Sequence, residues 1–213
     1  MTTYSRDDQL AVQPESSFGA KIEKSGAYVG RFTLAKERAA RTGTRGIEFT
    51  FESEDGQTAR YLTLWVARAN GDKIEYAHGL LSALMVCLDV KTISSAPVTV
   101  DEWNAELGAW APAQVEAFDA LMNKPVGVLL QREERVWEGR THVGMKMVDF
   151  FDPRDRSTPS EILAGTRSGQ GLARLVDNLR EKVVRLDVPP GGAAPEAAKG
   201  AGFYGVDEDD VPF

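Results

Sequence analysis

Residues 46–67 read GIEFTFESEDGQTARYLTLWVA, and this stretch decides the fold. Ile47, Phe49 and Phe51 alternate with polar residues, as in a strand that buries one face. The Glu-Asp-Gly triplet that follows is a strong hairpin signal. The apolar and aromatic residues of 58–67 predict another strand, so the stretch forms a β-hairpin.

A further strand is predicted before this hairpin. Apolar and polar residues alternate over 26–38, with Phe32 and Leu34 on the apolar side and Arg31 on the polar side. A glycine-containing loop at 41–46 connects it to the next strand. The three strands therefore predict an antiparallel meander.

The hydrophobic period changes after the meander. Apolar residues recur at helical spacing over 74–89, which predicts an amphipathic helix. Asn123 and Pro125 are typical of the end of a helix. The elements predicted from here on are a short helix at 112–123, strands at 126–137 and 142–150, and a last helix at 170–187.

The last predicted helix carries a seam of apolar residues at coiled-coil spacing. Two heptads are too short to establish a coiled coil. Packing against the sheet and pairing with a second subunit, as a homo-oligomer, are therefore both open. The seam consists of Leu172, Val176, Leu179, Val183 and Leu186.

Three strands, a helical insert and two strands resemble the OB-fold, a five-stranded Greek-key barrel. The expected class is α+β, mainly β with helices, although the insert at 70–124 is longer than the pattern requires and other small β-barrels fit the same order. We expect a flexible arm at 1–17, an OB-like domain at 18–187 and a disordered linker and acidic tail at 188–213.

The composition is that of an ordinary globular protein, with 42% hydrophobic and 27% charged residues in a chain of 213. The sequence has no apolar run of about 18 residues and no signal-peptide pattern. The single cysteine, Cys87, excludes an internal disulfide. We therefore expect a cytoplasmic protein, in a bacterial cell or in the host of a phage.

The net charge of −7 is unevenly distributed. Residues 189–213 hold one base against five acids, whereas residues 20–46 hold seven Lys or Arg against two Glu. The distribution of charge matters more than its sum for contact with nucleic acid. A basic face on the first hairpin favours such contact, and a solvated hairpin face is the alternative.

Aromatic and basic residues form the candidate nucleic-acid surface. If Leu62 and Leu64 fill the barrel, Tyr61 and Trp65 stand on the outer face as a platform for stacking bases. Packing of Trp65 under the helical insert is the alternative. The candidate residues, with the cations of the first and second loops, are Arg31, Arg38, Arg41, Arg45, Tyr61, Trp65, Arg132, Arg135, Trp137 and Arg140.

The sequence ends on four carboxylates followed by Val-Pro-Phe. The carboxylates repel one another and Pro212 disfavours helix, so the segment should be extended. A partner could then bind the ring and the adjacent α-carboxylate of Phe213 among basic side chains. An ordinary acidic tail is the alternative. The candidate partner-binding residues are Asp207, Glu208, Asp209, Asp210, Val211, Pro212 and Phe213.

This terminus resembles the C-terminal tip of bacterial and phage single-stranded DNA-binding proteins, and residues 189–202 look like the linker of that family. The resemblance covers about residues 189–213. It implies a protein that binds and protects single-stranded DNA and recruits replication, recombination and repair proteins through the tip. No cofactor is implied. The body does not match the usual bacterial form, which favours a phage origin.

Two other classes of function compete with this hypothesis. An adaptor or inhibitor would use the tip to compete for host repair proteins without binding DNA. A magnesium nuclease would use Asp149, Asp152 and Asp155, although such a string is more often a turn after a strand. His78 and His142 lie far apart in the sequence, and we expect a protein that is not an enzyme.

Overall fold

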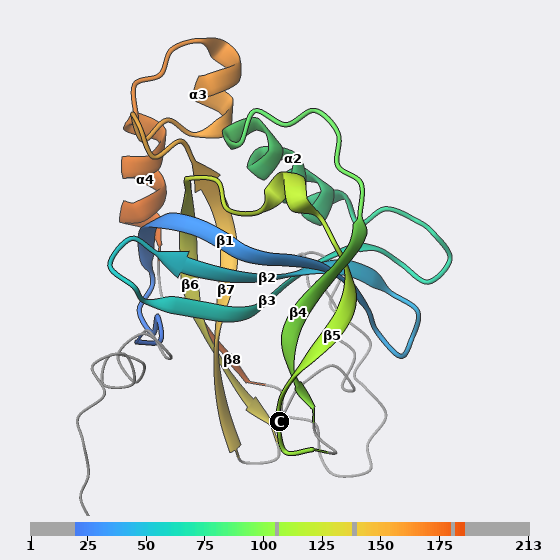
Figure 1. The fold of residues 1–213 in the computed structure, drawn as a ribbon. Coiled ribbons are helices and arrows are strands. Elements are labelled where there is room, and N and C mark those ends of the chain that lie inside the picture. The colour runs from blue at the N-terminus through green and yellow to red at the C-terminus, as the bar shows by residue number, and fades with distance from the viewer. Residues whose placement is uncertain (1–19, 105–106, 138–139, 180–181, 186–213) are drawn as a thin grey trace, which may run out of the picture.

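The computed structural model describes residues 20–104, 107–137, 140–179 and 182–185, so the predicted arm and tail lie outside the described residues. This part of the chain is mainly β, with a few helices (Figure 1). The strands are β1 (Gly26–Ala39), β2 (Arg45–Ser53), β3 (Thr58–Ala67), β4 (Ala96–Asn104), β5 (Ala109–Ala117), β6 (Val126–Trp137), β7 (Arg140–Phe151) and β8 (Lys182–Arg185). The helices are α2 (Glu75–Cys87), α3 (Pro159–Ala164) and α4 (Gln170–Asn178), with a 3₁₀ turn η1 (Asp119–Leu121).

The predicted meander is confirmed. β2 pairs antiparallel with both β1 and β3, and the turn between β2 and β3 contains Gly56 at φ +79°. The predicted helix at 74–89 is α2, and the predicted strand at 126–137 is β6. β7 is slightly longer than the strand predicted at 142–150.

β1 pairs with three strands: its first residues pair with β6, the rest pair with β2, and Lys36 also pairs with Ala117 of β5. Gly30 lies where the pairings with β6 and β2 meet. A Cβ atom at Gly30 would lie 2.1 Å from the carbonyl oxygen of Glu52 and 2.7 Å from the Cα of Ser53. Only glycine allows this approach, so Gly30 lets one strand join the β1–β3 meander to β6 and β7.

The sheet is open. Its pairs are antiparallel except for β6 and β8, which run parallel. Cα atoms of β3 and β7 come within 8 Å of one another, but no ladder joins these two strands in the described residues.

A bulge in β1 changes the inward-facing residues from those predicted. The register passes from Phe32 opposite Phe51 to Leu34 opposite Thr50, so Thr33 has no partner in the ladder. This shift buries Ala35 and leaves Leu34 half-buried. A shift of one residue exchanges the faces of a strand, and the later part of β1 is therefore inverted relative to the prediction.

The core is built around the ring of Phe32. Its centroid lies 4.7 Å from that of Phe49, 5.6 Å from that of Phe51 and 6.3 Å from that of Phe150. Helix α2 covers this core on one side of the β1–β3 layer (Figure 1). The residues that α2 buries are Ala77, Leu80, Leu81, Leu84 and Cys87.

The helix predicted at 112–123 is wrong. Residues 109–117 form β5, which pairs with β4 along its whole length, and only η1 follows. The turn contains Gly108 at φ +59°, a conformation that suits a hairpin. Pro112 disfavours a helix interior but is tolerated in a strand at a sheet edge.

The last helix is shorter than predicted, because α4 ends at Asn178 and residues 182–185 form β8 beside β6. The predicted seam is therefore divided between two elements and cannot pair helices as a unit. Leu172 is buried against Leu129 and Phe151, so α4 packs on the sheet.

Candidate nucleic-acid interface

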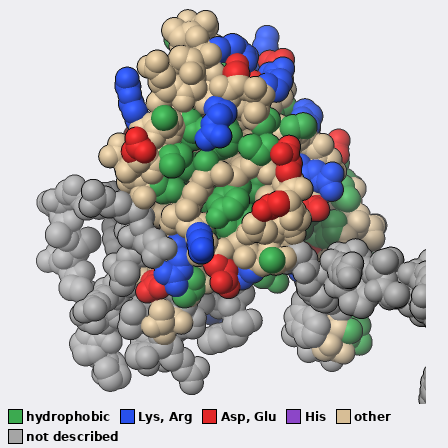
Figure 2. Space-filling model, turned by 90° about the vertical axis from the view of Figure 1, so that its left-hand side faces the viewer, with side chains coloured by type: hydrophobic (Ala, Val, Ile, Leu, Met, Phe, Trp, Pro, Cys, Tyr) green, Lys and Arg blue, Asp and Glu red, His purple; other side chains and the backbone are tan. Residues whose placement is uncertain are grey.

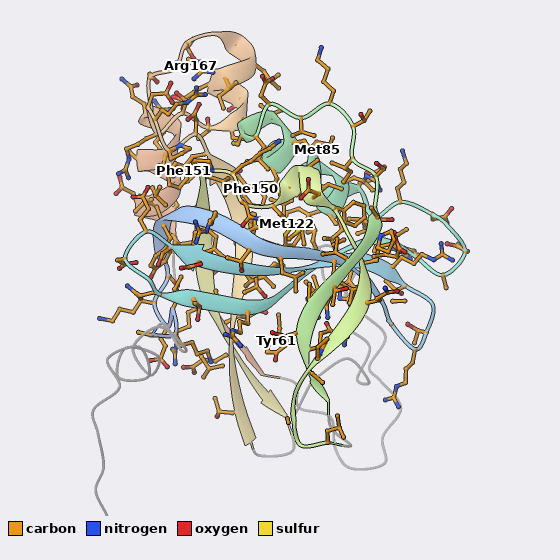
Figure 3. All side chains as sticks on the ribbon, viewed as in Figure 1. Tyr61, Met85, Met122, Phe150, Phe151 and Arg167 are labelled. Carbon is orange, nitrogen blue, oxygen red and sulfur yellow. The ribbon has the colours of Figure 1, made fainter. Side chains whose placement is uncertain are left out.

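The outward face of β3 carries an exposed aromatic side chain. Leu62 and Leu64 are only 2% and 6% exposed, whereas Tyr61 is 55% exposed. Figure 3 places Tyr61 on the side of β3 that faces away from α2. The ring of Tyr61 is therefore available to a ligand on the face opposite the helix.

Tyr61 also has an unusual backbone conformation. Its φ of +59° lies in the left-handed region, which disfavours residues other than glycine by roughly 1–2 kcal/mol. The register passes from Phe49 opposite Leu62 to Phe51 opposite Ala59, so β3 has one residue more than β2 here. A bulge of this kind re-aims a side chain, and such strain is concentrated at functional sites.

Trp65 lies across β2 rather than beneath the helical insert. Its partner in the ladder is Gly46, where a Cβ atom would come within 2.9 Å of the Cε3 atom of the indole. The core cluster that contains α2 includes Val66 but, within the described part of the chain, not Trp65. The half-buried indole therefore shares the outward face with Tyr61.

The predicted cations of the first hairpin are close to acidic residues of β2. Arg31 forms an ion pair of 3.3 Å with Glu52, and Arg38 one of 3.6 Å with Glu48. Arg41 and Arg45 are exposed around the β1–β2 turn. The outward face is therefore a mixture of both charges.

The same face carries an anchor for the β4–β5 hairpin. Nζ of Lys36 lies 3.2 Å from Oε1 of Glu48 and also donates a hydrogen bond to Glu102 of β4. Burial lowers the pKa of Lys36, but the bond to Glu102 and the charge of Glu48 outweigh it and raise the pKa overall. Ser95 Oγ donates to Glu37 at 2.8 Å. Because a helix was predicted at 112–123, the β4–β5 hairpin was not predicted. The alternation of apolar and polar residues over 96–104 is the sequence signal that indicates its first strand.

The second predicted loop is the end of the β6–β7 hairpin. Arg132 forms an ion pair of 2.5 Å with Glu134. The backbone register of the β6–β7 hairpin places the other three candidates: Arg135 lies opposite His142, and Trp137 lies opposite Arg140. The β1–β2 turn and this hairpin end leave the sheet in different directions (Figure 1). The structure thus brings Tyr61, Trp65, Arg31 and Arg38 to one face and separates the two loops.

The carboxylates considered for a nuclease are organised by arginines. Asp152 is only 1% exposed. The hydrogen bond from the Arg154 side chain lowers the pKa of Asp152, and burial opposes this shift. The backbone N–H of Arg154 and the side chain of Arg167 add to the lowering, so the pKa of Asp152 falls to about 2. Asp155 accepts a bond of 2.9 Å from Arg167. Burial raises the pKa of Asp149, although the N–H of Phe150 opposes the shift. Across the described ranges, no three His, Cys, Asp or Glu side chains are arranged to hold a metal ion.

A second face of the molecule also carries both charges. Figure 2 shows apolar side chains near its centre with basic and acidic side chains interspersed around them. A hollow of about 450 Å³ lies between α2, α3, α4 and the end of β7, and its lining includes Asp149, Ser160, Arg174 and Asn178. Both signs again lie close together, so this hollow does not favour an anionic ligand.

Comparison with known proteins does not assign the chain to a family. No protein-family model matches it, and no curated protein matches it. In the described part of the chain, no helix combines the length and apolarity needed to cross a bilayer. The candidate partner-binding residues 207–213 lie outside the described residues.

Proposed function

We propose that this chain binds single-stranded DNA with little sequence preference on the outward face of β2 and β3. The observation that carries this proposal is Tyr61, which is 55% exposed and whose backbone has a left-handed conformation within a strand. Stacking of a base on an aromatic ring contributes about 1–3 kcal/mol and tolerates every base. Trp65 adds a second ring on the same face.

The pairing of the strands supports this location. β1 pairs antiparallel with β2 and β6, β2 pairs with β3, and β6 pairs with β7. With α2 between the third and fourth of these strands, we propose an OB-like barrel to which the β4–β5 hairpin is added. OB-folds bind oligonucleotides on the face of their second and third strands, where Tyr61 and Trp65 lie.

Arginines around this face would bind phosphates. The Arg31–Glu52 pair is exposed, and exposed pairs contribute only about 0–1 kcal/mol, so a phosphate can replace Glu52. Arg38, Arg41 and Arg45 extend the path towards the β1–β2 turn. The end of the β6–β7 hairpin would add Arg132, Arg135, Trp137 and Arg140 on a longer strand.

The acidic terminus would recruit replication, recombination and repair proteins. Residues 207–213 combine four carboxylates with Pro212 and Phe213, which fits a partner with an apolar pocket surrounded by bases. β8 is the last described strand, and its parallel pairing with β6 brings the chain to the β6–β7 hairpin before the linker begins. We propose that the body binds DNA and the terminus binds proteins.

A second candidate function is an adaptor that uses the terminus without binding DNA. The observation that favours it is the acidic content of the proposed face, where Glu48 and Glu52 offset the arginines. Binding to nucleic acid separates the two functions directly.

The test is fluorescence anisotropy of a labelled oligothymidine of roughly 16 nucleotides, titrated with the full chain at low salt. A hairpin duplex of the same length is the control. Saturable binding to the single strand, at least about 10-fold tighter than to the duplex, supports the proposal. No complex with either probe overturns it and leaves the adaptor.

A further inference from the structure

The hollow between α2, α3, α4 and the end of β7 is separate from the face proposed for DNA. Its volume of about 450 Å³ is within the range of pockets that enclose small ligands. Figure 1 shows the three helices grouped at one end of the molecule. Ala83 of α2 lines the hollow, whereas Tyr61 faces away from α2 (Figure 3). A ligand in the hollow would therefore occupy a second site.

Strand β7 places the carboxylate of Asp149 in this hollow. Asp149 lies opposite Leu129 in the β6–β7 ladder, and residues directly opposite one another share a face of the sheet. Leu129 is buried with Leu172 of α4, so this is the face that α4 covers. Phe150 and Phe151, which follow Asp149, are also buried. The carboxylate is therefore held on a rigid strand rather than on a loop.

Asp149 has no cationic partner among the described residues. Its Oδ1 atom accepts a hydrogen bond of 2.8 Å from the N–H of Phe150, and no described Lys or Arg forms an ion pair with it. The residue is half-buried, and burial raises the pKa of Asp149 although the Phe150 N–H opposes the shift. A carboxylate that is partly removed from water in a cleft, without a cation, is a candidate for contact with a ligand.

The opposite wall of the hollow carries a free cation. Arg174 of α4 is exposed and, within the described ranges, forms no ion pair with Asp149 or with any other carboxylate. Half-buried apolar side chains line the space as well, namely Ala83, Pro159 and Leu175. The hollow thus combines a more buried negative group, apolar walls and a more exposed positive group.

Hydrogen bonds fix the walls in place. Glu161 of α3 accepts bonds from the backbone N–H of Gly171 in α4, at 3.1 Å, and from the side chain of Ser168. A Cβ atom at Gly171 would lie 2.9 Å from the side chain of Thr158, so the two helices begin in close contact. Arg167, in the loop between them, donates to Asp152 at 3.1 Å. A hollow held in this way is preformed, which lowers the cost of ordering it around a ligand.

We propose that this hollow binds a small zwitterion with an apolar side chain, whose ammonium group contacts Asp149 and whose carboxylate contacts Arg174. Each end of such a ligand supplies the charge that its side of the hollow lacks, and charge-assisted hydrogen bonds are the stronger ones. The apolar side chain would lie against Ala83, Pro159 and Leu175. A free amino acid and a dipeptide share this chemistry. The inference does not rest on DNA binding.

Isothermal titration calorimetry of the full chain with leucine and with leucyl-leucine tests the proposal. Saturable binding of either ligand supports it, and the tighter of the two identifies the source of the zwitterion. Acetylation of the amino group should weaken that ligand by about 10-fold or more, because it removes the charge that faces Asp149. Amidation of the carboxylate should weaken it less, because Arg174 is exposed. No binding of either ligand up to about 10 mM overturns the proposal.

Variants of the two charged residues give a second test. Asp149→Asn keeps the size of the side chain and should weaken the free ligand by about 10-fold or more. Asp177→Asn, which changes an exposed carboxylate of α4 outside the lining of the hollow, is the matched control and should retain binding. Arg174→Met should weaken the free ligand but not the amidated one, since the two changes remove the same contact.

The results also separate this site from the DNA-binding face. Equal affinity for the free and acetylated ligands, or unchanged affinity of Asp149→Asn, overturns the zwitterion site. The comparison of ligands uses the unmodified chain, so it remains decisive even if a variant unfolds. Tyr61→Ala should leave this binding unchanged, and loss of binding in that variant would contradict the separation of the two sites.

Discussion

Nζ of Lys36 lies 3.2 Å from Oε1 of Glu48, and this ion pair is enclosed on the outward face of the sheet rather than in the core. The two side chains are only 13% and 8% exposed, because the β4–β5 hairpin lies over them through Glu102. Arg38 approaches the other carboxylate oxygen of Glu48 at 3.6 Å. This charged cluster joins β1 and β2, where Lys36 and Glu48 are partners in one ladder, to β4, which pairs with β5 in the described residues.

Lys36→Met should lower the free energy of unfolding by about 3 kcal/mol, since it removes the nearer partner of the buried Glu48 carboxylate and leaves it only the pair with Arg38 at 3.6 Å. Urea denaturation followed by circular dichroism measures the change. Arg31→Met, which breaks the exposed pair with Glu52, should change stability by less than about 1 kcal/mol. Equal losses in the two variants would show that enclosure of the Lys36 pair has no energetic effect.

Asp152 should make stability depend on pH in the acidic range. In the folded state the pKa of Asp152 is about 2, below the usual value of about 3.9 that it has in the unfolded chain. The contribution of Asp152 to the free energy of unfolding is therefore complete above about pH 4 and is lost as the pH falls through about 2. Asp152→Asn should therefore lower the free energy of unfolding by about 2 kcal/mol at pH 7, with a difference that shrinks below about pH 4. Urea denaturation across this range measures it, and a constant difference contradicts the assignment.

Gly127 should not tolerate even a methyl group. A Cβ atom there would lie 2.2 Å from the ring of Phe151, which is buried with Leu129 of β6 and Leu172 of α4. We expect Gly127→Ala to lower the free energy of unfolding by about 2–3 kcal/mol. Gly144→Ala is the matched control, because a Cβ atom at this β7 position meets nothing within 4 Å. Thermal denaturation compares them, and similar midpoints would refute the close packing.

Tyr61→Gly should separate stability from DNA binding. Glycine accommodates the left-handed φ, so the free energy of unfolding should rise by about 1 kcal/mol, while loss of the ring should weaken oligothymidine binding by about 10-fold. Urea denaturation and anisotropy measure the two effects. Tyr61→Phe keeps the ring and should retain binding, and Tyr76→Ala removes an exposed ring from α2 and should also retain it. Unchanged affinity of Tyr61→Gly would remove Tyr61 from the site.

Removal of residues 207–213 should tighten DNA binding at low salt, because the carboxylates compete with DNA for the same arginines. The difference should disappear as salt rises, and the log of the affinity should fall against log salt with a slope of about −0.7 for each phosphate contact. Anisotropy titrations of the full and shortened chains measure both quantities. Equal affinities at low salt would exclude competition by the tail.

Elements with a strong local pattern could be predicted from the sequence. The alternation of Leu62 and Leu64 with polar and aromatic neighbours places β3 correctly, and the helical spacing of Leu80, Leu81 and Leu84 places α2. Elements whose conformation depends on a distant partner could not. Val115 and Phe118 fit a helical period, yet residues 109–117 form a strand because β4 lies beside them.

The candidate site shows the same division. That Tyr61 is on the opposite face from Leu62 follows from the two-residue period of a strand. Its left-handed φ does not, because the bulge exists only in the register with β2. The partners of Arg31 and Arg38 are likewise fixed by strand pairing and not by neighbours in the sequence.

The order of residues was thus enough to predict the β1–β3 meander, helix α2 and the β6–β7 hairpin, since short-range periodicity and turn chemistry specify them. The β4–β5 hairpin, the end of α4 at Asn178, the strand β8 and the charged cluster around Lys36 depended on segments that meet in space. Hydrogen-bond ladders and ion pairs between distant segments leave no local pattern, because their energy depends on a partner whose position the fold alone provides.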